Sequence, residues 1–426
     1  MLGVIDLALI CVFAVVYAWL FYNLPILATG VRNLRRGKQR LQGQRVAEDR
    51  LPSFSVVVPV KNEVKVVGRL LEALSHLSYP ADKVEIVVVE DGSTDGTFEV
   101  CRQFASAHGN VKVLQRPFSN GKPSALNYGV KHTRGEVVVV FDADSVPADD
   151  ALLRAAEYFE DPAVAAVQGR TLSINSQENM LTQLLSYEEA LECEAYLGGK
   201  DALGLFVHLK GTCQFIRRDV LERLSGFDES MLCEDMEFSA RLTENGYKIR
   251  YGHDVRAWQE SPPNLKTLFG QRTRWFRGRM EVAVKYGRLM AKVDRRNLDA
   301  EATLFGPFIL VASLLSYLAA SGTFFAASPF NDLWRVFVHF STFITTLTLL
   351  LCGFALIYVS RPKRVRNLLW LPFVFGYWCL QAFIALHAAL LILLRRPKIW
   401  LKTEKKGVIA SSTFVSQKEQ AHARNG

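Results

Sequence analysis

Residues 137–144 read Val-Val-Val-Val-Phe-Asp-Ala-Asp, and the fold can be worked out from this stretch. Five apolar residues in a row are typical of a strand buried on both faces, because a half-exposed strand alternates apolar and polar residues. The acidic residues Asp142 and Asp144 follow at once. Side chains at positions i and i+2 at the end of a strand point to the same side, so the two carboxylates are placed to act together.

The same pattern recurs upstream of this stretch. Apolar runs occur at Phe54–Val60, Val84–Val89 and Val111–Leu114. Helical stretches separate the runs, at 62–76, 95–108 and 124–132. Apolar strands that alternate with helices predict an α/β fold, a mostly parallel sheet covered on both faces. Ligands bind such sheets beyond the carboxyl ends of the strands, where polar residues gather in this chain.

Composition indicates membrane segments as well as this domain. Of the 426 residues 50% are hydrophobic, and the mean hydropathy is +0.11, which is seldom seen in a soluble enzyme of this size. The net charge of +9 lies beside apolar segments rather than on a recognition motif, so no nucleic-acid partner is expected. The seven cysteines show no C-x-x-C spacing and fit reduced, buried thiols.

The first apolar run reaches about Ala28 and is long enough to span a bilayer. It lacks a charged N-region and a cleavage site, so we do not expect a cleaved signal peptide. Basic residues follow it: Arg32, Arg35, Arg36, Lys38 and Arg40. By the positive-inside rule the next domain is cytosolic, and the chain is expected to be a multi-pass protein of the cell membrane.

Three further spans are expected, at roughly 304–328, 334–360 and 368–394. Four crossings place the tail outside, although it begins with the basic stretch 395–398. Either the positive-inside rule fails there or one segment does not fully cross; Pro372 and Gly376 make the last segment suspect.

The expected organisation has five parts. They are an N-terminal membrane helix (1–30), a cytosolic catalytic domain (51–263), amphipathic interface helices (264–300), C-terminal membrane helices (304–394) and a basic, polar tail (395–426). The part at 264–300 mixes Arg and Lys with apolar residues, which suits a membrane interface and also an ordinary amphipathic core helix.

Several motifs in the catalytic domain carry side chains suited to chemistry. Asp142 and Asp144 can grip one hard cation, which in turn binds phosphate oxygens, although an Asp-x-Asp also often starts a turn. Asp91 lies at a strand tip, where it can contact a base or ribose. Lys122 near a helix start can hold a phosphate, and a solvated surface lysine is the alternative.

Two further motifs follow, one acidic at 234–235 and one basic at 271–275. Glu234 and Asp235 lie among apolar neighbours, which can raise the basicity of a carboxylate; the alternative is an acidic pair favoured by a helix dipole. The stretch 271–275 offers arginine for a pyrophosphate and Trp275 for a sugar ring, or forms a membrane-interface belt.

Taken in order, these motifs resemble those of family 2 glycosyltransferases of the cellulose synthase and hyaluronan synthase type, over about Pro52–Arg279. The matching residues are Val58-Pro59 with Asn62-Glu63, Glu90-Asp91-Gly92-Ser93 with Asp95, Lys122 with Ala125-Leu126-Asn127, Asp142 and Asp144, Glu234-Asp235, and Gln271 with Arg274-Trp275. The family's first acidic position in the second motif is Glu90 here, a mild departure.

The resemblance implies a GT-A fold and a reaction that inverts the donor sugar. It implies donor contacts from Pro59, Glu63, Asp91, Lys122, Asp142, Gln271 and Arg274. It assigns Mn²⁺ or Mg²⁺ to Asp142 and Asp144, the general base to Asp235 beside Glu234, and acceptor contacts to Gly211, Thr212 and Trp275. The partners implied are a nucleotide-sugar donor, a lipid-linked or glycan acceptor, and membrane lipid.

The acceptor is left open between two classes. The short set of membrane helices favours one sugar added to a polyprenyl- or dolichyl-phosphate-linked acceptor or a glycolipid. The Gln-x-x-Arg-Trp motif is typical of processive β-polysaccharide synthases, which is the alternative. A catalytically inactive nucleotide-sugar binder is disfavoured because every expected carboxylate is present. UDP-glucose, UDP-N-acetylglucosamine and GDP-mannose all remain as donors.

Overall fold

The computed structural model describes residues 4–36, 47–288, 294–325, 369–398, 403 and 405–407, and single positions between 339 and 353. The chain divides into two compact units. The helical unit comprises Met1–Lys38, Ala190–Leu205 and Phe269–Leu401. The sheet unit comprises Gln39–Glu189, Phe206–Leu268 and Lys402–Gly426.

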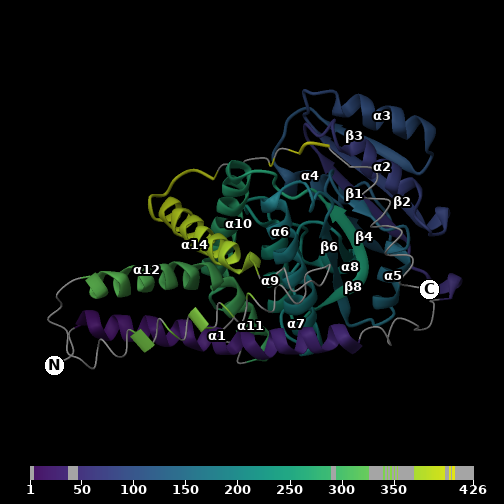
Figure 1. The fold of residues 1–426 in the computed structure, drawn as a ribbon. Helices are drawn as coiled ribbons and strands as arrows, with labels where there is room; N and C mark the ends of the chain where they lie inside the picture. The colour runs from purple at the N-terminus through teal and green to yellow at the C-terminus, as the bar shows by residue number, and fades with distance from the viewer. Residues whose placement is uncertain are drawn as a thin grey trace. The chain divides into compact units, whose positions relative to one another are not determined.

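The sheet unit is built on an eight-stranded sheet with the order β3-β2-β1-β4-β7-β6-β8-β5 (Figure 1). The strands are β1 (Phe54–Val60), β2 (Val84–Asp91), β3 (Val111–Arg116), β4 (Val137–Val140), β5 (Val146–Pro147), β6 (Val164–Ser173), β7 (Gln214–Arg217) and β8 (Lys248–Gln259). Strands β1 to β4 pair in parallel, whereas β7 is antiparallel to both β4 and β6. The α/β fold with a mostly parallel sheet in its first half is confirmed.

Helices cover this sheet. They are α2 (Val67–Ser75), α3 (Thr97–Ala107), α4 (Lys122–Val130), α5 (Ala151–Tyr158), α6 (Met180–Ala190), α8 (Arg218–Arg223) and α9 (Glu234–Glu244), with short 3-10 turns at Glu48–Arg50 and Ala81–Lys83. Helix α4 packs on β1 and β2, where Gly129 lies directly against Val57 and Val89. Burial on both faces explains why these strands are apolar throughout.

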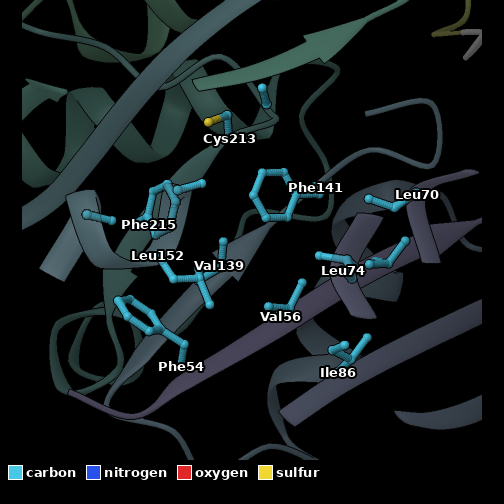
Figure 2. Packing of buried hydrophobic residues seen from close by; sticks show 14 of the residues in the cluster. Phe54, Val56, Leu70, Leu74, Ile86, Val139, Phe141, Leu152, Cys213 and Phe215 are labelled. Carbon is cyan, nitrogen blue, oxygen red and sulfur yellow. The ribbon is translucent and has the colours of Figure 1, made fainter. Parts of the chain in front are cut away.

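The opposite face of the parallel strands carries the main core (Figure 2). Alternate residues such as Val56 and Val139 point into it, and Leu70 and Leu74 of α2 belong to the same core cluster. The rings of Phe54 and Phe215 meet edge to face with centroids 6.1 Å apart. The period-2 alternation of a strand therefore divides one apolar run between two buried faces.

The helical unit holds the candidate membrane segments. Its helices are α1 (Val4–Arg36), a π-helix η4 (Leu191–Leu197), α7 (Gly198–Ala202), α10 (Leu265–Tyr286, which starts in the sheet unit), α11 (Arg295–Leu304), α12 (Gly306–Phe325) and α14 (Leu371–Leu393). Within the described residues, two stretches are long and apolar enough to cross a membrane, Phe13–Asn33 and Pro372–Leu393. A third candidate is the pair α11 and α12, which is bent by 50°.

The expected span at 334–360 lies almost wholly outside the described residues, as does the tail beyond 407. The expected helix at 62–76 begins later, at Val67. Its start is displaced because Asn62 adopts a φ of 54° and its side chain accepts a hydrogen bond from the Thr94 backbone N at 2.7 Å. A long-range contact has replaced the first turn of helix.

Candidate active site

Three parallel strands end at one edge of the sheet, and a polar segment from the sequence motifs follows each. Strand β1 leads to Asn62, β2 ends in Asp91, and β4 leads to Asp142. The loops after β1 and β2 are joined, because the backbone N of Glu63 donates to Thr97 Oγ1 at 2.8 Å. Pro59 lies within β1 just before this loop, so Pro59 and Glu63 both belong to this edge.

Asp91 is buried at the end of β2. Ser119 Oγ donates to its Oδ2 at 2.5 Å, and Arg116 on the adjacent β3 lies 3.3 Å from its Oδ1. Phe118, the neighbour of Ser119 in the chain, is 80% exposed. Asp91 thus has a cation and a hydroxyl as partners, and exposed Phe118 lies in the segment that supplies that hydroxyl. These groups form one end of the candidate site.

Lys122 opens α4 and joins three parts of the site. Its Nζ donates to Asp142 Oδ1 at 2.6 Å and to the Gly211 backbone O at 2.9 Å, and lies 3.5 Å from Glu234 Oε1. Burial alone lowers the pKa of this ammonium, but the carboxylates of Asp142 and Glu234 outweigh burial, so its pKa is raised. Lys122 is therefore charged and is not a solvated surface lysine.

The two carboxylates of the Asp-x-Asp motif have opposite pKa shifts. Burial, together with the charges of Asp144 and Glu234, raises the pKa of Asp142, although Lys122 offsets part of the effect. Burial also acts to raise the pKa of Asp144, but Lys405 outweighs it and the pKa is lowered. Asp144 Oδ2 further accepts from the Glu260 backbone N at 3.0 Å. The charge of Asp144 is thus one of the causes of the raised pKa of Asp142.

Lys405 is a residue of the site that sequence reasoning missed. Its Nζ lies 2.6 Å from Asp144 Oδ2 and donates to the Glu260 backbone O at 2.9 Å. The backbone N of Lys406 donates to Glu260 Oε2 at 3.0 Å, so a stretch of the tail lies on the sheet unit. The contact between Lys405 and Asp144 could not be predicted, because nothing in the basic tail indicates which carboxylate a given lysine will bind.

Glu234 and Asp235 occupy the first turn of α9. Ser239 Oγ donates to the Asp235 backbone O at 2.6 Å, and its oxygen also accepts from the Leu209 backbone N at 2.8 Å. This fastens the start of α9 to the segment that leads into Gly211. A Cβ at Gly211 would lie 3.1 Å from both Asp235 Oδ2 and Lys122 Nζ, so Gly211 lies between the two groups.

Thr212 connects the same loop to the Asp-x-Asp motif. Its Oγ1 accepts from the Asp142 backbone N at 3.0 Å and contacts Ser145 Oγ at 2.8 Å. The side chain is almost fully buried. The structure thus gathers Lys122, Asp142, Gly211, Thr212, Glu234 and Asp235 around one loop of the sheet unit.

Gln271, Arg274 and Trp275 lie together on α10 in the helical unit, within the stretch expected to be amphipathic. The Arg272 guanidinium lies over the Trp275 ring at 4.5 Å from its centroid. A cation stacked on an indole holds that ring in a defined orientation.

Comparison with known proteins identifies a family for this chain. Residues 52–278 match the family model described as "Glycosyltransferase like family 2". The chain is 28% identical over 410 residues to the probable glycosyltransferase YdaM of Bacillus subtilis, covering 92% of this chain and 96% of that protein. It is 32% identical over 251 residues to a beta-monoglucosyldiacylglycerol synthase of Nostoc, covering 58% of this chain and 53% of the synthase.

A solved structure has the same fold. The mannosyltransferase PcManGT from Pyrobaculum calidifontis, in complex with GDP-Man and Mn²⁺, superposes with a TM-score of 0.57 at 22% identity. The alignment covers 91% of this chain and 100% of that one. The GT-A fold is therefore confirmed. With the family model spanning the whole strand-and-motif region, the chain belongs to the family 2 glycosyltransferases.

Proposed function

We propose that this enzyme is an inverting, metal-dependent hexosyltransferase that moves a sugar from a UDP- or GDP-sugar to a lipid-linked acceptor, forming a β-glycosidic bond. The observation that carries the proposal is the meeting of Lys122, Asp142 and the Glu234–Asp235 pair around Gly211. The same loop therefore brings together a cation for phosphate (Lys122), a carboxylate for a metal (Asp142) and a candidate base (Asp235).

The Asp-x-Asp carboxylates fit a divalent cation. Their oxygens are the hard ligands that Mg²⁺ and Mn²⁺ prefer, and each carboxylate already binds an ammonium, Lys122 or Lys405. These two ion pairs indicate that the electrostatic potential around the two carboxylates stabilises a positive charge. Bound there, Mn²⁺ or Mg²⁺ would neutralise the charge that develops on the leaving diphosphate.

The donor nucleotide is assigned to the edge formed by β1, β2 and β3. Asp91, with its partner Arg116, presents hydrogen-bonding groups for a base or ribose, and exposed Phe118 offers a ring face. Pro59 and Glu63 border the same edge. Lys122 would bind the diphosphate, and Gln271 and Arg274 of α10 are assigned to the same diphosphate, which an arginine can bind through two hydrogen bonds.

The transfer step requires a base for the acceptor hydroxyl. We assign it to Asp235: its carboxylate takes the hydroxyl proton while the acceptor oxygen bonds to the anomeric carbon and the bond to the diphosphate breaks. Gly211 leaves the space beside Asp235 Oδ2 free of a side chain. Thr212 would hold this loop for the acceptor, and Trp275 would stack on the acceptor sugar.

A lipid acceptor is supported by two features. The described residues include two helices apolar enough to cross a membrane, so the enzyme is membrane-associated. The Nostoc relative is named for a glycolipid product. The Gln-x-x-Arg-Trp residues on α10 keep a small processive β-polysaccharide synthase as the second candidate.

The test is donor consumption by purified full-length protein with Mn²⁺ and a panel of UDP- and GDP-sugars. Each donor is offered alone, with diacylglycerol, and with a short polyprenyl phosphate or its glycosylated form. We expect one donor to be consumed only with a lipid, and the product to gain one sugar. A ladder of products from donor alone would replace this proposal with the processive synthase.

A further inference from the structure

A buried glutamine on β6 fixes the loop that carries Gly211. The side chain of Gln168 is fully buried. Its Oε1 accepts from the Lys210 backbone N at 2.8 Å, and its Nε2 donates to the Thr212 backbone O at 3.1 Å. One amide therefore binds the residue before Gly211 through its backbone N and the residue after it through its backbone O, while Gln214 Oε1 accepts from the Gly211 backbone N at 3.2 Å. These contacts restrain the loop that presents the Gly211 carbonyl.

The loop has a backbone conformation that needs such support. Gly211 has a φ of 78°, and Cys213, which carries a Cβ, has a φ of 50°. A positive φ is disfavoured for a residue with a side chain, so it persists only where the surroundings hold it. The Gly169 backbone N donates to the Cys213 backbone O at 2.8 Å, and Gln168 Nε2 also donates to the Gly169 backbone O at 2.8 Å.

The position of this loop bears directly on Asp142. The ammonium of Lys122 is shared between the Gly211 backbone O at 2.9 Å and Asp142 Oδ1 at 2.6 Å. If the Gly211 carbonyl moves away, the ammonium keeps only its carboxylate partners. It then neutralises Asp142 more fully, and a divalent cation must compete harder for the same oxygen.

We propose that Gln168 is a positioning residue for metal binding. By holding the Gly211 carbonyl, it keeps Lys122 shared and leaves Asp142 available to a divalent cation. Gln168 is buried below the loop and acts through Gly211 and Lys122. The proposal rests on the proposed function, because it assumes that Asp142 and Asp144 bind the metal.

The direct test is Mn²⁺ binding to the nucleotide-free, full-length protein, followed by the electron paramagnetic resonance signal of free Mn²⁺. Gln168→Met removes both hydrogen-bonding ends of the side chain. We expect its dissociation constant for Mn²⁺ to rise about 10-fold, the lower end of what loss of an outer-shell partner costs. Gln168→Glu keeps an acceptor for Lys210 but places a carboxyl oxygen against the backbone O of Gly169 and Thr212, so a rise of at least the same size is expected; it remains a test if Gln168→Met unfolds.

A matched control lies on the same strand. Ser173 is also a buried polar residue of β6, but its hydroxyl binds Asn175 and Ser261. Ser173→Ala is expected to leave Mn²⁺ binding unchanged. An equal loss of Mn²⁺ affinity in Ser173→Ala would mean that the effect is general loosening of β6, and would overturn the proposal.

A double-mutant cycle with Lys122→Met tests the route. If Gln168 acts through Lys122, then Gln168→Met changes Mn²⁺ affinity by less than about twofold once Lys122 is absent. If Gln168→Met lowers Mn²⁺ affinity equally with and without Lys122, Gln168 does not act through Lys122. Wild-type Mn²⁺ affinity in Gln168→Met would also overturn the proposal. Wild-type protein that binds no Mn²⁺ would instead overturn the metal role of Asp142 and Asp144, and this proposal with it.

Discussion

At the scale of single residues, the candidate site is a balance of charges in which each carboxylate of the Asp-x-Asp motif has its own lysine. Lys122 binds Asp142 and Lys405 binds Asp144, at 2.6 Å in both cases. The outcome differs because Asp142 also faces Asp144 and Glu234, whereas Asp144 also accepts a backbone hydrogen bond. The pKa of Asp142 is therefore raised and that of Asp144 lowered.

These opposite shifts predict how metal binding depends on pH. A carboxylate binds Mn²⁺ in its ionised form, so affinity falls as pH drops through the pKa of the first group to protonate. That group is Asp142, whose pKa is raised, and the loss begins at higher pH than for an ordinary aspartate. Titration of Mn²⁺ affinity against pH checks this; Asp142→Asn should abolish this first step, and its persistence in that variant would contradict the assignment.

Removing the proposed base should stop transfer without stopping donor binding. We expect Asp235→Asn to lower kcat by about 10²- to 10⁴-fold, the usual contribution of a general base. The affinity for the nucleotide sugar, measured by calorimetry, should change by less than about twofold, which corresponds to under about 0.5 kcal/mol of binding free energy. Asp219→Asn at an exposed position of α8 is the control, because Asp219 and its partner Arg223 are equally exposed. Unchanged turnover in Asp235→Asn would remove the residue from the mechanism.

Lys405 competes with a metal for Asp144, so Lys405→Ala should strengthen Mn²⁺ binding in the absence of nucleotide. The metal-free variant should be less stable, because Asp144 is almost fully buried and loses its partner. Mn²⁺ should then raise the Tm of Lys405→Ala more than that of the wild type. Lys406→Ala, whose side chain binds Glu178 instead, is the matched control and should behave as wild type.

At the scale of elements, the helical unit depends on close backbone contact between α1 and the segment formed by η4 and α7. A Cβ at Gly30 would lie 1.8 Å from the Ala195 backbone O, and one at Gly199 would lie 2.1 Å from the Ile26 backbone O. A fully buried ion pair, Lys200 Nζ to Asp299 Oδ1 at 2.9 Å, fastens α11 to α7. Small residues at such crossings let helices pack through their backbones.

Gly30→Ala should therefore destabilise the helical unit. The new methyl group meets backbone atoms, which cannot rotate away, so we expect a loss of about 1–3 kcal/mol, typical of overpacking. Gly376→Ala on α14 is the control, since no atom of the described residues lies within 4 Å of a Cβ there. Thermal unfolding of both variants in detergent compares them, and equal Tm values would show that α1 does not pack as described.

At the scale of the whole molecule, the tail decides a question of membrane topology. Lys405 lies on the sheet unit, and α14 and its C-terminal turn are described as far as Lys398. The five residues from 398 to 403 reach at most about 18 Å, less than the roughly 30 Å of a bilayer core. We therefore expect the C-terminal end of α14 and the tail at 403–407 to face the same side of a membrane.

On this expectation, the chain crosses the membrane an even number of times between the catalytic domain and the tail. Three full spans after the catalytic domain do not satisfy this, and the 50° bend between α11 and α12 marks the segment that we expect to turn back. Single cysteines placed at Lys406 and at exposed Glu72 should react with an impermeant maleimide from the same side. Labelling from opposite sides would rule out an even count.

Much of the fold could be predicted because its signal is local. Phe54–Val60 was expected as a strand and is β1, and the runs that became β2, β3 and β4 were placed to within two residues at their ends. Apolar runs of this kind can be buried only as strands within a covered sheet. The start of α2 could not be predicted, because its displacement depends on Asn62 binding a loop after another strand.

The sequence by itself determined the fold class and the family of this protein, since both depend on short motifs and on the order in which they follow strands. The tertiary structure alone decided which charges meet: Lys122 with Gly211, Lys405 with Asp144, and Gln168 with the loop at 210–212. The physical reason is that a side chain's partners are set by chain segments brought together on folding. Lys405 and Asp144 are far apart in the sequence, and nothing local to either residue encodes the other.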